Sequence, residues 1–268
     1  ARKEKDRLEG LVSDTSDTGD DTSVRVAAQE YLEELLSTKN SLRPSAEEAV
    51  ETELDRVIKD HGLTWWLGMT LPPVDIRFEL PPTLLITSRR DQLIVREAIL
   101  LEPDLDVLKR DKIENRLFEE YNLAALVDDL AGISTYPSLV SDLDTLRDIL
   151  QTAAHEWLHA HLFFKPLGRN FRRSEQMFSL NETVADLAGR ELGDMVFMRF
   201  GGTIQENTKR YSAPAERDPV FTREMRETRN RVKELLDEGK IVEAEEYMKA
   251  RWWEFRLGGY RIRKLNQA

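Results

Sequence analysis

The sequence predicts an α+β protein that is mostly helical, with a small antiparallel sheet preceding a pair of long helices. Several long stretches repeat apolar residues at helical spacing. Between residues 72 and 101, two pairs of prolines and a charged turn separate short β-prone runs. The 268 residues are 40% hydrophobic and 33% charged, which fits a helix-rich chain long enough to bury a core.

The first third is predicted to be a tail followed by two helices. Residues 1–22 are polar and acidic without periodicity, and residues 23–38 have the spacing of an amphipathic helix. A second helix is expected from Ser45 to about Asp60. Ser45 and Glu48 have the spacing of a capping box, in which each side chain bonds to the other's backbone.

The remaining elements follow from alternation, helical periodicity and turn residues. In the middle we expect strands over 74–80, 83–88 and 93–101, a charged helix over 107–130 ended by Gly132, and an edge strand over 133–140. After it we expect a long helix that opens at Ser141 and ends before Pro166, a helix over 180–199, and a helical hairpin over 221–238 and 242–255. The predicted domains are the tail 1–22, a domain over 23–215 that includes the N-terminal helices, and the hairpin 216–268 packed on it.

The first long helix contains the motif His155-Glu156-Trp157-Leu158-His159. Four residues make about one helical turn, so both imidazoles project from one face and are placed to bind one zinc ion. Glu156 lies about 100° around the helix, too far for a ligand but within reach of a zinc-bound water. The alternative is a pair of surface histidines on an amphipathic helix.

The second long helix supplies a third candidate ligand, Glu182, in the run Asn181-Glu182-Thr183-Val184-Ala185-Asp186. Asp186 lies one turn further along the same face and is predicted to accept a hydrogen bond from a ligating imidazole. Two ordinary alternatives stay open: Glu182 forms a capping box with Ser179, and Asp186 is a solvated helix charge.

Together the two motifs resemble those of the gluzincin metallopeptidases, the thermolysin-like and predicted aminopeptidase group, over about residues 141–200. The resemblance implies that His155, His159 and Glu182 bind one zinc ion per chain. It further implies that Glu156 is the general base and that Asp186 orients a histidine. No third histidine follows at the metzincin spacing.

Other polar candidates are weaker. His161 faces away from the predicted metal, so a solvated or hydrogen-bonded role is expected for it. Tyr136 and Tyr211 are candidates for stabilising the oxyanion of the tetrahedral intermediate, and for each a structural role is the alternative.

The composition excludes several functions. Without cysteine the chain has no disulfide, thiolate nucleophile or cysteine-bound metal. A net charge of −11 without a strong basic cluster argues against nucleic-acid binding. The predicted function is zinc-dependent hydrolysis of peptide bonds in a peptide or protein substrate. The alternatives are a hydrolase of a non-peptide amide and a metal-stabilised binding or scaffold protein without turnover.

The N-terminus suggests a membrane context. The chain opens with Ala1-Arg2-Lys3-Glu4-Lys5 and no methionine, and basic residues commonly flank the cytoplasmic end of a membrane segment. We therefore expect a longer natural protein that is tethered to, or exported across, a membrane. An arbitrary boundary in a cytosolic protein is an equal alternative.

Overall fold

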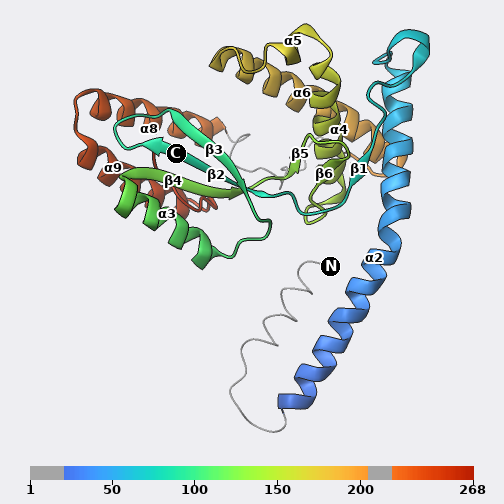
Figure 1. Cartoon of the computed structure of the whole chain (residues 1–268), viewed down its shortest axis with the longest axis horizontal. Helices are drawn as coiled ribbons and strands as arrows, with labels where there is room; N and C mark the ends of the chain where they lie inside the picture. The colour runs from blue at the N-terminus through green and yellow to red at the C-terminus, as the bar shows by residue number, and fades with distance from the viewer. Residues whose placement is uncertain (1–20, 205–218) are drawn as a thin grey trace. The chain divides into compact units, whose positions relative to one another are not determined.

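The computed structural model describes residues 21–204 and 219–268 and has the predicted mostly helical α+β fold (Figure 1). The chain divides into two compact units. Unit 1 comprises Ala1–Glu79 and Ser134–Thr203, and unit 2 comprises Leu80–Ile133 and Ile204–Ala268. This division differs from the predicted domains, because the antiparallel strands group with the C-terminal hairpin and not with the helices of the histidine motif.

Unit 1 begins with helix α2 (Asp21–Asp60), which is continuous where the sequence predicted two helices. Pro44 lies inside it, so the predicted helix start and capping box at Ser45 are wrong. A proline removes one amide donor from the helix interior. Apolar residues after the proline, such as Val50 and Leu54, pack into the core, and this burial favours the continuous helix.

The predicted strands over 74–80 and 133–140 shorten to β1 (Ile76–Arg77) and β6 (Ser138–Val140), which pair in parallel. Carboxylates of α2 accept hydrogen bonds from backbone amides that, in a longer sheet, would donate to a neighbouring strand. Glu51 accepts from the Ile76 amide and Glu47 from the Phe78 amide, each at 2.8 Å. A single turn of 3-10 helix, Trp66–Gly68, connects α2 to this region.

Three helices complete unit 1: α4 (Leu146–Phe163), α5 (Pro166–Arg169) and α6 (Glu175–Arg199). Thr145 caps α4 and Ser174 caps α6, so α4 starts later and α6 earlier than predicted. Helices α2, α4 and α6 enclose the core of the unit, whose buried members include Leu54, Ile58, Leu150, Trp157 and Val196.

Unit 2 contains the predicted antiparallel sheet, with β2 (Thr83–Arg89) between β3 (Val95–Leu101) and β4 (Leu123–Asp129). Helix α3 (Val107–Tyr121) stops at Asn122, which adopts the left-handed conformation and caps it. The predicted helix over 107–130 was therefore wrong beyond Tyr121. Pairing with β2 overrides the helical propensity of this leucine- and alanine-rich segment.

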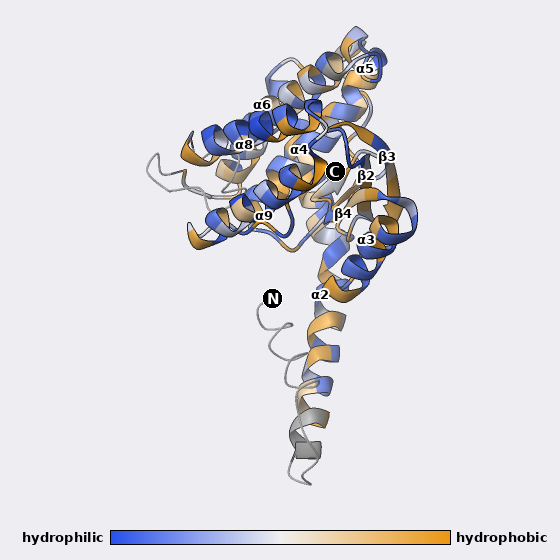
Figure 2. Cartoon of the chain, turned by 90° about the vertical axis from the view of Figure 1, so that its left-hand side faces the viewer, coloured by the Kyte–Doolittle hydropathy of each residue, from blue (hydrophilic) through white to orange (hydrophobic). Residues whose placement is uncertain are grey.

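The two-residue strand β5 (Gly132–Ile133) ends the first part of unit 2. The predicted hairpin is confirmed as α8 (Pro219–Asp237) and α9 (Ile241–Leu257), with Gly239 at a positive φ of 74° in the turn. Figure 2 shows polar and apolar residues on different sides of helices such as α3. Within the described residues, no helix has the length and apolar character needed to cross a membrane.

Candidate metal centre

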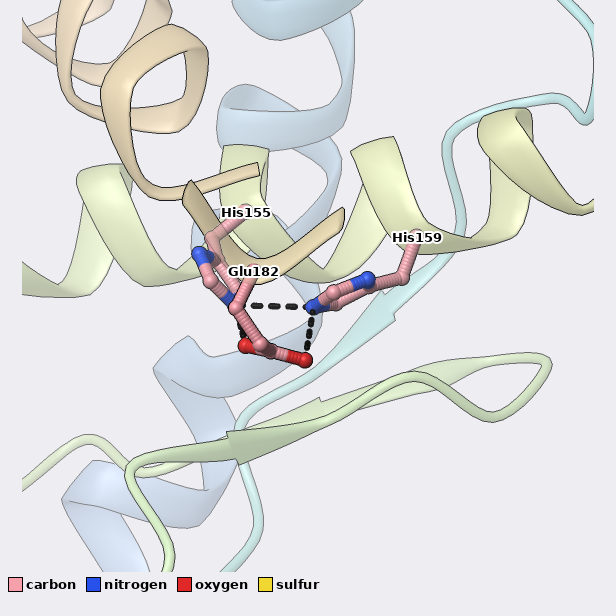
Figure 3. A group of neighbouring side chains, drawn as sticks. All are labelled: His155, His159 and Glu182. Atoms are coloured by element: carbon pink, nitrogen blue, oxygen red, sulfur yellow. Dashed lines mark hydrogen bonds and ion pairs between the residues drawn. The ribbon is translucent and has the colours of Figure 1, made fainter. Parts of the chain in front are cut away.

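Three predicted ligands come together between α4 and α6 (Figure 3). The Nε2 atoms of His155 and His159 lie 3.0 Å apart. The Glu182 carboxylate faces both, with Oε1 3.5 Å from His159 Nε2 and Oε2 3.7 Å from His155 Nε2. Two helices that are separate in sequence thus direct two nitrogens and a carboxylate at one point.

This spacing suits a tetrahedral metal ion. Zinc binds nitrogen and carboxylate oxygen at about 2.0–2.2 Å, which places neighbouring ligand atoms about 3.3–3.6 Å apart. The donor chemistry fits as well. The carboxamide oxygen of Asn181 accepts from His159 Nδ1 at 2.8 Å, so the neutral ring directs a lone pair on Nε2 towards His155. A cation between these nitrogens would satisfy both.

Two glycines of α6 allow the helices to approach closely. A Cβ atom at Gly189 would lie 2.9 Å from the Cα atom of His155, and one at Gly193 would lie 2.5 Å from the Cα atom of Gln151. We call this the glycine contact. Beside it, Asp194 accepts two hydrogen bonds from Arg147 at 2.6 Å and one from Gln151 at 2.5 Å. The contact and the ion pair hold Glu182 opposite the histidines.

Glu156 is buried next to the cluster, with 8% of its surface exposed. Burial raises the pKa of its carboxyl group to about 7; the charge of His159 opposes this shift and that of Glu182 adds to it. Its backbone carbonyl accepts from the Ser134 hydroxyl at 2.9 Å, which anchors this turn of α4. A carboxyl group with a pKa near neutrality is suited to taking and returning a proton.

The two histidines differ in their proton affinity. Burial, reinforced by the charge of His159, lowers the pKa of His155 to about 4. Burial also acts to lower the pKa of His159, but the carboxylate of Glu182 outweighs it and the pKa is raised. The contact with His159 in turn lowers the pKa of Glu182. At neutral pH His155 and Glu182 are therefore in the deprotonated forms that bind metal.

The partners around the ligands differ from those expected. Asp186, predicted to orient an imidazole, accepts from Arg190 Nε at 2.7 Å. The side chain that accepts from a histidine of the cluster is that of Asn181, buried at the start of the same motif. Neither Asn181 nor the glycine contact was predicted from the sequence to have a role. Two features of the sequence could have indicated these roles: the position of Asn181 beside Glu182 and the four-residue spacing of the glycines.

Several alternatives are now decided. Ser179 lies inside α6, whose first residue is Glu175, so Glu182 does not form a capping box with it. His161 Nδ1 donates to the Leu71 carbonyl at 2.7 Å, and this histidine lies outside the cluster, as predicted. Tyr136 is 60% exposed, and Tyr211 lies outside the described residues.

Comparison with known proteins identifies no relative. The chain matches no family model, no curated protein and no solved structure at a significant level.

Proposed function

We propose that this protein is a zinc-dependent hydrolase of peptide bonds, with His155, His159 and Glu182 as ligands and Glu156 as the base. The observation that supports this most directly is the convergence of three ligand atoms beside a buried carboxyl group whose pKa is about 7. The chain has no cysteine, so a site of imidazole and carboxylate donors is the one it can build for zinc.

The number of ligands favours catalysis over a purely structural role. Structural zinc sites are usually closed by four protein ligands, whereas catalytic sites have three and an open position. Among the described residues, the cluster holds His155, His159 and Glu182 and no fourth histidine, aspartate or glutamate. A fourth coordination position is then free for water.

Glu156 completes the proposed reaction. Bound zinc lowers the pKa of a coordinated water and polarises the substrate carbonyl. Glu156 takes a proton from the attacking water and gives it to the nitrogen of the leaving amine as the carbon–nitrogen bond breaks. The products are a carboxylate and an amine, and Glu156 returns to its starting state.

Metal content and activity test the proposal together. We expect about one zinc per chain in protein purified without chelator, by elemental analysis. We also expect cleavage of a peptide mixture, followed by mass spectrometry, that stops with chelator and returns with zinc. Glu182→Ala should lose the metal, while Glu191→Ala, an exposed glutamate on the same helix, should keep it.

Three outcomes would contradict the proposal. Protein that stays metal-free after zinc is added would exclude the site. Protein that holds zinc but cleaves neither peptides nor simple amides would instead be a metal-stabilised scaffold. If the protein cleaves simple amides but no peptides, its substrate is a non-peptide amide.

A further inference from the structure

We propose that unit 1 docks on an anionic lipid surface through an exposed patch of apolar and basic side chains. None of its residues is a proposed metal ligand, although the Phe171 ring contacts that of His159, with centroids 6.1 Å apart. This docking patch consists of two segments, residues 65–69 after α2 and residues 163–173 from the end of α4 through α5. Figure 1 shows the loop after α2 and helix α5 at the same end of the unit.

Side-chain contacts hold the two segments of the patch together. The Lys165 ammonium lies 4.4 Å from the centre of the Trp65 ring. Behind them, His161 Nδ1 lies 2.7 Å from the Leu71 carbonyl, and Trp157 Nε1 donates to the Pro72 carbonyl at 2.9 Å. The loop is thus fixed against the C-terminal half of α4.

The apolar members of the patch protrude from the surface. Trp66 is 77% exposed, Leu67 is 73% exposed and Phe163 is 66% exposed. Leu67 has a φ of 66°, a conformation that a bulky residue rarely adopts. The Trp65 amide donates to the Met69 carbonyl at 2.7 Å and closes the turn that holds Leu67 outward. Strained backbone of this kind is typical of functional positions.

The patch is positively charged in an acidic protein. Residues 160–174 contain Lys165, Arg169, Arg172 and Arg173 but no aspartate or glutamate, although the whole chain carries a net charge of −11. None of the four forms a salt bridge with a described residue. Their charge is therefore available to an external anion.

A lipid surface suits this combination better than a folded partner. Protruding side chains need a complementary pocket in a protein, whereas the headgroup region of a bilayer accommodates them without one. Tryptophan is enriched at that depth, and lysine and arginine near the surface are attracted to anionic lipids. Since the described helices do not span a bilayer, the docking we propose is peripheral.

Vesicle flotation of the full chain tests the docking patch. The vesicles would be phosphatidylcholine alone, or phosphatidylcholine with 30% phosphatidylserine, at low and physiological salt. We expect binding to the anionic vesicles alone, weakened by salt. Arg172→Glu/Arg173→Glu should reduce that binding at least about tenfold, and so should Trp66→Ser/Leu67→Ser. Thermal unfolding would verify that both variants fold.

The matched control is Arg226→Glu/Arg229→Glu, which makes the same change of charge on exposed arginines of α8. It should bind as the original protein does. Equal loss in the control would mean unspecific charge attraction and would overturn the proposal, as would absence of binding to anionic vesicles. A further outcome is self-association of the original protein without lipid. If the Trp66→Ser/Leu67→Ser variant abolishes such self-association, the patch is a contact between copies of the chain and the lipid proposal is overturned.

Discussion

Two buried glutamates, one in each unit, show how neighbours decide what a carboxyl group can do. Glu156 in unit 1 is 8% exposed and Glu114 in unit 2 is 1% exposed. Burial dominates at Glu156 and raises its pKa to about 7. Burial acts in the same direction at Glu114, but hydrogen bonds from Arg263 and Lys264 outweigh it and the pKa is lowered.

The contacts explain the difference. The Glu114 carboxylate accepts from Lys264 Nζ at 2.9 Å, from the Val127 amide at 2.7 Å and from both terminal nitrogens of Arg263. The carboxylate oxygens of Glu114 are thus occupied by these donors. The bonds from Arg263 and Lys264 hold the C-terminal segment against α3 and β4. Among the described residues, no lysine or arginine forms an ion pair with Glu156. Its carboxyl group can therefore take up and release a proton. One carboxylate is suited to structure and the other to chemistry.

The largest expected effect separates the two roles directly. Glu156→Gln should reduce peptide hydrolysis by at least about a thousandfold, because an amide of the same size cannot take the proton. Zinc content and thermal stability should change little. Turnover, elemental analysis and calorimetry on the same sample measure all three. Near-normal turnover would show that Glu156 is not the base.

The same substitution at the other glutamate should have the opposite result. Glu114→Gln leaves Lys264 without a partner charge and Arg263 with Asp111 alone, and it should lower the free energy of unfolding by about 2–4 kcal/mol, measured with denaturant. Zinc content should be unchanged. Glu120→Gln, on the exposed face of α3, is the control and should show no measurable loss. A stable Glu114→Gln protein would mean that this ion pair contributes little.

The partners of the metal ligands give a third, smaller effect. Asn181→Ala removes the acceptor that orients His159 and should weaken zinc binding about 10–100-fold. Asp186→Ala should weaken it less, because its carboxylate binds Arg190. Competition with a zinc chelator measures both. A larger loss at position 186 would restore the orienting role that the sequence analysis predicted for Asp186.

The smallest expected effect is the pH dependence of stability, which sharpens the comparison of the two glutamates. The folded-state pKa of Glu114 lies below that of an unfolded glutamate, about 4.3. The stabilisation that its charge provides is therefore complete above that pH and is lost as pH falls through the folded pKa. The advantage of the original protein over Glu114→Gln should shrink below about pH 4.3. A constant difference down to pH 3 would contradict this assignment.

The parts of the fold that follow from local pattern were predictable from the sequence. The hairpin α8–α9 and the strands β2 and β3 follow from periodicity and turn residues. The convergence of His155 and His159 follows from their spacing of one helical turn. Each of these needs only residues that are near one another in the chain.

The parts that depend on distant partners were not predictable in this way. Residues 123–129 became strand β4 because β2 was available to pair with them. Helix α2 continues through Pro44, and apolar residues beyond the proline pack into the core. The Asp186–Arg190 pair is different, because its residues lie one helical turn apart and their spacing is visible in the sequence. Asn181 binds His159 only because α6 crosses α4 at the right distance, which is determined by the glycine contact.

The glycine contact also has a consequence for how the protein can vary in sequence. In a saturation library of α6, positions 189 and 193 should accept almost nothing but glycine, since even a methyl group would meet the backbone of α4. Exposed positions of the same helix, such as Leu187 and Glu191, should tolerate most residues. Mutational tolerance along α6 would then trace the line on which α4 and α6 meet, without any substrate or metal being known.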